Sequence, residues 1–146
     1  KPVVGPNNNI YIASNRTGEL WSLNQKGEKK WKFNADGPIR STPAVSAKGT
    51  LYFGTDQGTV YALDSRGEVK WKKKIDARIF SSPALSGSGT LYIANWDDLL
   101  YALKTASDGL AQSIWPAYQH DNQNTGQQKK DKDDGNKSGW GLPWDF

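Results

Sequence analysis

Apolar and polar residues alternate in short segments along most of the first hundred residues. One unit of this pattern covers residues 41–74 and holds four such segments. Alternation at period two places every second side chain of a strand against a core. Polar residues followed by glycine separate the segments, and glycine supplies the positive φ of tight hairpin turns. We therefore predict strands at residues 41–46, 50–55, 59–63 and 68–74, with turns at 47–49, 56–58 and 64–67.

The same unit repeats about every 40 residues. Tyr11, Tyr52 and Tyr92 are spaced by 41 and 40 residues, and Trp31 and Trp71 are 40 residues apart. A helical repeat does not fit, because the segments are rich in β-branched and aromatic residues and hold no 3.6-residue period. Four strands in a unit of this length are typical of a β-propeller blade. The predicted fold class is all-β, with about three blades of four antiparallel strands and a flexible C-terminal tail.

The composition divides the chain into three parts. Residues 1–126 carry the propeller repeats, residues 127–138 are a polar and charged linker, and residues 139–146 are rich in aromatic side chains. Three blades do not close a ring, since closed propellers use ~4–8 blades. An open stack also exposes two apolar blade faces. We therefore expect an incomplete ring. The chain is then either the C-terminal part of a larger propeller or a subunit that completes its ring by association.

The residues of the second unit point to a known family. The segment "GTLYFGTDQGTVYALDSRGEVKW" at 49–71, flanked by "SSPAL", resembles the quinoprotein-like propeller repeat, also called the PQQ-like repeat. The resemblance implies a β-propeller in which an Ala-x-Asp, glycine and tryptophan segment docks adjacent blades. The first unit departs from this pattern at Ser22 and Asn24. The residues that the resemblance assigns to blade docking are Ala62, Asp64, Gly67 and Trp71, with Trp31 in the first unit.

The third unit departs further from the pattern. It loses the repeat after Leu103, and "SIWPAYQHDNQNTG" at 113–126 resembles a segment that often ends bacterial secreted propellers of this kind. The resemblance implies a periplasmic, cell-surface or secreted location, as for the family members that bind other proteins. The residues that fit the terminal segment are Trp115, Pro116, Tyr118, Asp121, Thr125 and Gly126.

Candidate catalytic chemistry is sparse. The enzymes of this family hold pyrroloquinoline quinone and calcium through motifs that have no match here, and the chain has no cysteine for thiolate metal sites. Asp64 lies in a glycine-bounded turn, where an aspartate more often binds its own backbone. His120 is the single histidine and lacks the partners of a triad. We predict no catalytic, metal or cofactor-binding residue and no cofactor. A fragment of a quinone-dependent dehydrogenase and a carbohydrate- or surface-binding module remain open as alternatives.

The net charge and the C-terminal residues favour a function in binding other proteins. The net charge of +4 is mild, and Lys72 to Lys74 fall on a predicted edge strand, where lysine blocks edge-to-edge pairing. No run of ~18 apolar residues is present. We predict a non-catalytic extracytoplasmic scaffold that binds proteins, either the remaining blades or another subunit, with no nucleic-acid binding and no transmembrane segment. The residues predicted to contact the partner are Trp140, Leu142, Trp144 and Phe146.

Overall fold

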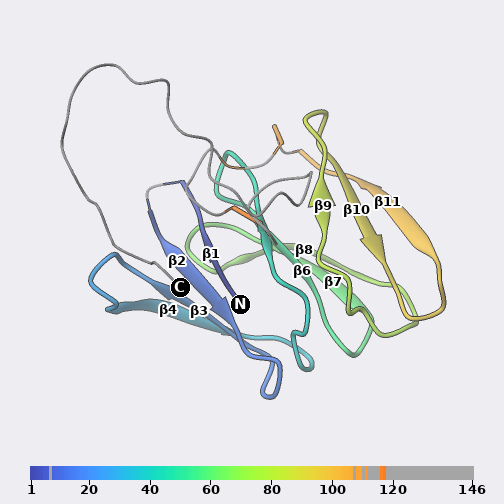
Figure 1. Cartoon of the computed structure of the whole chain (residues 1–146), viewed down its shortest axis with the longest axis horizontal. Coiled ribbons are helices and arrows are strands. Elements are labelled where there is room, and N and C mark those ends of the chain that lie inside the picture. The colour runs from blue at the N-terminus through green and yellow to red at the C-terminus, as the bar shows by residue number, and fades with distance from the viewer. Residues whose placement is uncertain (7, 107, 110, 112–115, 118–146) are drawn as a thin grey trace, which may run out of the picture.

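The computed structural model describes residues 1–6, 8–106, 108–109, 111 and 116–117. These residues form three antiparallel sheets that lie side by side (Figure 1). The first two sheets have four strands each, and the third has three among the described residues. The predicted all-β fold of propeller blades is confirmed. The predicted linker and aromatic peptide lie outside the described residues, which contain no helix long and apolar enough to cross a membrane.

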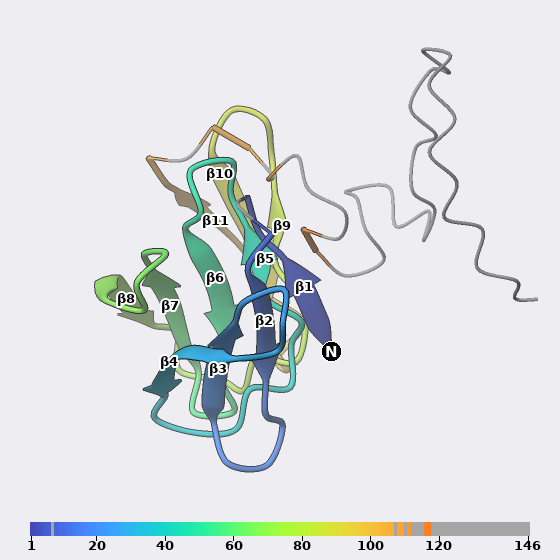
Figure 2. The same ribbon diagram turned by 90° about the vertical axis from the view of Figure 1, so that its left-hand side faces the viewer.

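Each sheet is one blade and takes its strands in chain order. Blade 1 consists of β1 (Pro2–Val4), β2 (Ile10–Ala13), β3 (Glu19–Leu23) and β4 (Lys29–Asn34). Blade 2 consists of β5 (Ala44–Val45), β6 (Leu51–Gly54), β7 (Thr59–Leu63) and β8 (Val69–Lys74). Blade 3 consists of β9 (Ala84–Leu85), β10 (Thr90–Ala94) and β11 (Leu100–Lys104). The first strands β1, β5 and β9 lie on the same side of the molecule (Figure 2). All four strands predicted for blade 2 are present.

The hairpin turns follow from the residues that the sequence places in them. Gly67 has a φ of 87°, which glycine adopts without strain. Asp64 Oδ1 accepts hydrogen bonds from the backbone N–H groups of Arg66 (2.9 Å) and Glu68 (3.0 Å), which confirms its predicted place in the turn. Burial raises the pKa of Asp64, but these hydrogen bonds and the Arg66 guanidinium outweigh burial, so that the pKa lies below its usual value. Asn24 makes the equivalent turn in blade 1.

Each blade has two faces of different composition. One face carries Tyr11 in blade 1, Tyr52 in blade 2 and Tyr92 in blade 3, and we call it the tyrosine face. The opposite side of each sheet is the reverse face. In blade 2 the reverse face carries the cross-strand pair Phe53 and Tyr61, whose rings stack with centroids 5.3 Å apart. Because side chains alternate along a strand, consecutive strand residues belong to opposite faces.

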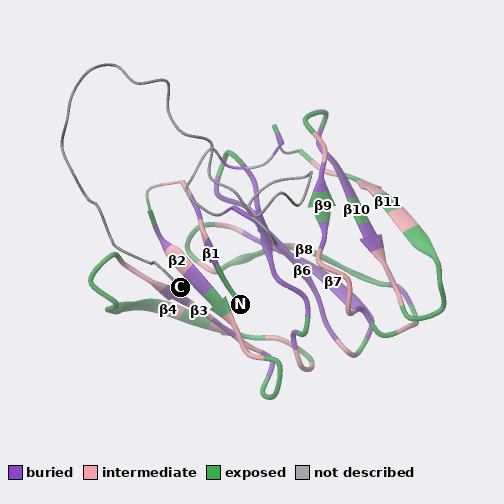
Figure 3. Ribbon diagram, viewed as in Figure 1, coloured by how far each residue is buried: buried purple, intermediate pink, exposed green. Residues whose placement is uncertain are grey.

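The blades pack with a tyrosine face against a reverse face. The tyrosine face of blade 1 and the reverse face of blade 2 share a core that includes Tyr11 and Phe53. The tyrosine face of blade 2 and the reverse face of blade 3 share a second core that includes Tyr52 and Leu91. Blade 2 lies between two neighbours, so every residue of β6 and β7 is buried (Figure 3). Burial of apolar area, at about 25 cal/mol per Å², is therefore concentrated around blade 2.

Asp36, in the segment between blades 1 and 2, holds the β6–β7 hairpin. Its carboxylate accepts hydrogen bonds from the hydroxyl groups of Thr55 (2.8 Å) and Thr59 (2.5 Å). Burial raises the pKa of Tyr61, and the nearby negative charge of Asp36 raises it further. The connecting segment thus fixes the position of the hairpin that follows it, which matters because such hairpins form one end of the molecule.

Residues beyond blade 3 return to blade 2. The backbone N–H of Ala111 donates to the carbonyl of Val45 (2.7 Å), and the N–H of Val45 donates to the carbonyl of Pro116 (2.9 Å). Ala111 is buried in the core between blades 1 and 2. The sequence marks only the loss of the repeat after Leu103, so it does not predict this long-range pairing with β5.

Candidate interaction surface

Trp31 joins blade 1 to a turn of blade 2. Its Nε1–H donates a hydrogen bond to the backbone carbonyl of Ser65 (2.9 Å). The indole also covers Gly67, where a Cβ atom would lie 2.8 Å from two ring carbons of Trp31. Glycine is needed at this turn for two reasons, its positive φ and the ring above it. These contacts support the docking role that the resemblance assigns to Trp31 and Gly67.

Trp71 repeats the arrangement within blade 2. Its ring centroid lies 5.9 Å from that of Tyr52 with the planes at 41°, close to the 5.8 Å and 39° between Tyr11 and Trp31. Ala62 is its cross-strand neighbour and is fully buried on the tyrosine face. The structure therefore places Ala62 and Trp71 on the side of blade 2 that packs against blade 3.

The side of Trp71 toward blade 3 is less closely packed. Trp71 lines a groove of about 460 Å³ between β8 and β11, together with Leu103, Lys104 and neighbouring residues of both strands. Lys104 stands at the repeat position of Asp64. The aspartate turn found in blade 2 therefore has no direct counterpart here. Asp64 itself acts within its own turn and makes its hydrogen bonds to Arg66 and to the backbone.

The tyrosine face of blade 3 is open. Tyr92 is 40% exposed, whereas Tyr52 at the same position of blade 2 is 2% exposed. The cross-strand neighbours of Tyr92, which are Ala84 and Ala102, are exposed as well. Leu100, on the same face, is 69% exposed. Contiguous exposed apolar side chains on one side of a sheet mark an interaction surface.

The β10–β11 hairpin adds a second exposed apolar group. Trp96 is 68% exposed and Leu99 is 53% exposed. The Oδ1 atom of Asn95 shapes the hairpin by accepting two backbone hydrogen bonds, including one from Leu99 (3.0 Å). The corresponding hairpins of blades 1 and 2, at 14–18 and 55–58, contain only polar residues and glycine. Trp96 has no counterpart in them, so docking between blades does not explain it.

Trp96 is anchored to the segment that precedes blade 3. Its N–H donates to the carbonyl of Arg78 (2.8 Å), and its ring packs edge-on against Phe80 with the centroids 5.1 Å apart. The guanidinium of Arg40 lies 5.5 Å from the centre of the Phe80 ring and pairs with Asp56 (2.8 Å). This row of side chains runs from the β6–β7 hairpin to the β10–β11 hairpin. It fixes one side of the indole while most of Trp96 stays exposed.

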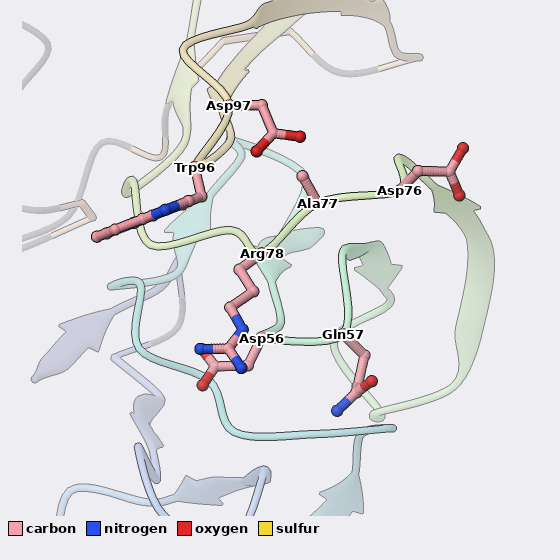
Figure 4. A pocket seen from close by; sticks show the side chains of 7 residues that line it. All are labelled: Asp56, Gln57, Asp76, Ala77, Arg78, Trp96 and Asp97. Carbon is pink, nitrogen blue, oxygen red and sulfur yellow. The ribbon is translucent and has the colours of Figure 1, made fainter.

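A groove of about 370 Å³ lies beside this tryptophan, and we call it the Trp96 groove (Figure 4). Its carboxylates outnumber its one guanidinium, so its charge is negative. Trp and Arg are the residue types enriched in the hot spots of protein interfaces. The groove thus suits a loop or peptide that carries basic side chains. Its lining includes Asp56, Gln57, Asp76, Arg78, Trp96 and Asp97.

Trp96 is the site residue that the sequence does not predict. The signal that points to it is its departure from the repeat, because a side chain that occurs in one blade only is not required by blade packing.

The segment that ends the repeat, 113–126, is described only at residues 116–117. Within the described residues, no three His, Cys, Asp or Glu side chains gather as a metal site. The predicted partner contacts Trp140, Leu142, Trp144 and Phe146 lie outside the described residues.

The sheets, their packing and the recurring Tyr–Trp contacts define the class of protein, a β-propeller segment built from PQQ-like repeats. A protein-family model described as outer membrane protein assembly factor BamB matches residues 2–130. The chain belongs to this family, which confirms the family resemblance of the repeat.

A solved structure supports the fold. The crystal structure of BamB from Moraxella catarrhalis resembles the chain with a TM-score of 0.62 and 21% sequence identity. The match covers 77% of this chain and 34% of that one, so the chain spans about a third of the length of BamB. A search of curated proteins gave no match.

Proposed function

We propose that the chain is a non-catalytic scaffold for protein–protein interaction in the bacterial envelope, within a propeller that other blades complete. Membership of a family described as an outer membrane protein assembly factor supports this function and a periplasmic or outer-membrane-associated location. The observation that carries the proposal is the exposure of Trp96 and Leu99 beside an acidic groove. The partner is then a protein of outer-membrane protein assembly.

The scaffold works by holding a loop surface rigid. Trp96 and Leu99 supply apolar anchors, and Arg78 and Asp97 at the groove supply charged contacts that fix the register of a bound segment. The packed blades prevent the hairpins from moving independently. In this proposal the docking residues keep neighbouring hairpins aligned. They are Trp31, Ala62, Asp64, Gly67 and Trp71.

The aromatic peptide at 139–146 is a second proposed contact with the same partner. Trp140, Leu142, Trp144 and Phe146 lie within seven residues and follow a polar, charged stretch at 127–138. A tethered second contact raises the affinity of a complex through effective concentration. Deletion of 139–146 should therefore weaken partner binding without changing the fold.

The proposal is tested with the immobilised full chain and an outer-membrane extract. The double variant Trp96→Ala/Leu99→Ala should recover at least about tenfold less of the assembly proteins than the parent chain, because truncation of central aromatic anchors commonly costs about 2 kcal/mol or more, and about 1.4 kcal/mol is tenfold in affinity. Quantitative mass spectrometry of the recovered proteins is the measurement. Both side chains are exposed, so the circular dichroism spectrum of the variant should match that of the parent.

The matched control is Val69→Ala, because Val69 is 46% exposed and lies on the outer strand β8, away from the Trp96 groove. Recovery should be unchanged in this variant. Equal recovery by the parent and the Trp96→Ala/Leu99→Ala variant would argue against the groove as the binding site. Dye-linked alcohol or sugar oxidation after reconstitution with pyrroloquinoline quinone and calcium would contradict the non-catalytic function.

A further inference from the structure

Lysine is concentrated on the outer strands of the first two blades. β4 pairs only with β3, and β8 pairs only with β7, so both are outer edges of their sheets. Figure 2 shows them on the opposite side of the molecule from β1 and β5. Every lysine of these two strands is exposed, and we call this set the lysine rim. The rim consists of Lys29, Lys30, Lys32, Lys70, Lys72, Lys73 and Lys74.

The charge of the chain is divided unevenly between the rim and the rest. The rim holds seven of the 19 Lys and Arg residues, and its two strands contain no Asp or Glu. The remainder of the chain carries 12 Lys and Arg against 15 Asp and Glu, so its formal charge is negative. The mild net charge of +4 therefore conceals a strongly basic edge.

Most of the charges on the rim are not neutralised within the chain. Lys32 pairs with Glu19 (2.9 Å), and it is the only rim lysine that forms an ion pair with another described residue. Lys70 Nζ donates to the hydroxyl oxygen of Thr50 (3.3 Å), a neutral group that leaves the positive charge in place. Neighbouring like charges repel one another. An anionic surface bound against the rim would relieve this repulsion.

We propose that the lysine rim binds the surface of an anionic phospholipid bilayer. Lysine is a compact, strongly hydrated point charge, whereas arginine is suited to bidentate recognition of a single phosphate group. Neither strand contains arginine. The rim therefore suits a diffuse anionic surface better than one bound ligand. Lysines near such a surface each add to the attraction, which falls off within a Debye length.

The exposure of the rim does not depend on what covers the end blades. β8 belongs to blade 2, which packs against a neighbour on both sides, and its four lysines are exposed all the same. The inference adds a second surface to the scaffold, because the Trp96 groove is acidic and is formed by hairpins and a connecting segment. The choice of a bilayer as the anionic surface rests on the proposed envelope location.

Flotation of the purified full chain with lipid vesicles tests the inference. One set of vesicles is phosphatidylcholine alone, and the other contains equal parts of phosphatidylcholine and phosphatidylglycerol. The parent chain should float with the anionic vesicles only. Raising the salt from about 0.1 M to about 1 M should lower its partition coefficient at least about tenfold, because the Debye length falls from about 10 Å to about 3 Å. Aggregated protein sinks, so loss of edge protection is distinguished from loss of lipid binding.

Variants of the rim separate its charge from the net charge of the chain. Lys72→Gln/Lys73→Gln should lower the partition coefficient at least about tenfold at about 0.1 M salt. Lys72→Arg/Lys73→Arg keeps both charges and should float like the parent. The matched control Arg16→Gln/Lys48→Gln removes the same charge from exposed turn residues outside the rim, and it should stay within about twofold of the parent. Circular dichroism should show the parent fold in each variant.

Three results would overturn the inference. The first is a parent chain that does not float with anionic vesicles, and binding to soluble heparin in that case would assign the rim to a soluble polyanion. The second is equal flotation of the parent and Lys72→Gln/Lys73→Gln, or equal loss in the matched control. The third is loss of flotation in Trp96→Ala/Leu99→Ala, which would assign the binding to insertion of apolar side chains.

The flotation assay contains only the purified chain and lipid, whereas the scaffold function is tested by recovery of proteins from an extract. Failure of lipid binding therefore leaves the Trp96 groove as the proposed protein-binding site. Failure of protein recovery leaves the lipid assay and its outcome unchanged.

Discussion

Blades 2 and 3 carry the same tyrosine face in two different environments. The cross-strand row is alanine, tyrosine and alanine in both, yet Tyr52 is 2% exposed and Tyr92 is 40% exposed. Blade 3 covers the first row, and no blade of the described chain covers the second. The difference shows that a strand's own residues determine which face is apolar, whereas the following blade decides whether that face is buried. A blade of this kind is therefore stable only as far as it has neighbours.

The largest difference between the two blades should appear when their tyrosines are removed. Tyr52→Ala should lower the free energy of unfolding by about 3–5 kcal/mol, the usual loss for a large buried aromatic residue. Tyr92→Ala should lower it by about 1 kcal/mol or less, because that side chain is partly in solvent. Urea unfolding in dilute solution measures both, since association would add to the apparent stability of the parent. Equal losses would show that the face of blade 3 is covered in solution.

The turn glycines offer a second comparison, between a turn with a docked tryptophan and one without. Gly67 has a φ of 87° and lies under Trp31, whereas Gly27 has a φ of 80° and a Cβ atom added to it would meet no described atom within 4 Å. Gly27→Ala should cost about 1 kcal/mol from backbone strain alone. Gly67→Ala should cost about 1–2 kcal/mol more, because the new methyl group displaces the indole.

The difference between the two glycine variants, measured from their urea unfolding midpoints, isolates the docking contact from the strain of the turn. The chain has seven tryptophans, so the fluorescence of Trp31 is isolated by comparison with Trp31→Phe, and it then gives an independent reading of indole displacement in Gly67→Ala. Equal destabilisation of the two variants would show that the contact between Trp31 and Gly67 contributes little to blade docking.

A smaller effect is expected where blade 1 departs from the tyrosine face of its neighbours. Ser22 stands at the position of Ala62 and Ala102, and its buried Oγ has no hydrogen-bond partner within the described part of the chain. Ser22→Ala should raise the free energy of unfolding by about 1 kcal/mol, because an unsatisfied buried hydroxyl is removed. The control is Ser41→Ala, which should lose about 1 kcal/mol, since Ser41 Oγ donates to the carbonyl of Gly54 (3.2 Å). Thermal unfolding of both variants is the measurement, and a destabilised Ser22→Ala would contradict the interpretation.

The sequence predicts the features that depend on neighbouring residues. Period-two alternation locates the strands of blade 2, and glycine at position 67 marks a turn because that turn needs a positive φ. Asp64 binds the backbone of its own turn as its position between two strands suggests. The 40-residue spacing of Trp31 and Trp71 marks them as part of the repeat, and their role in docking blades stays a prediction.

The features that the sequence does not predict depend on contacts between distant residues. Tyr52 and Tyr92 have nearly the same local sequence, so no local pattern distinguishes the buried residue from the exposed one. The exposure of Trp96 depends on Phe80 and Arg78, which belong to the segment before blade 3. The binding of Ala111 to Val45 links a strand to a segment outside the repeat.

The hydrogen bonds between Val45 and the segment beyond blade 3 also mean that β5 gains these partners late during synthesis. Val45 leaves the ribosome about 66 residues before Ala111, and chains grow at about 5–20 residues per second. Pro116 follows Val45 by 71 residues, so the inner edge of β5 waits roughly 4–14 s until both partners are present. During that interval it is open to mispairing with another nascent chain, as unpaired strand edges are. Once this segment has been synthesised, its hydrogen bonds cover the edge of β5 and remove it as a site of mispairing.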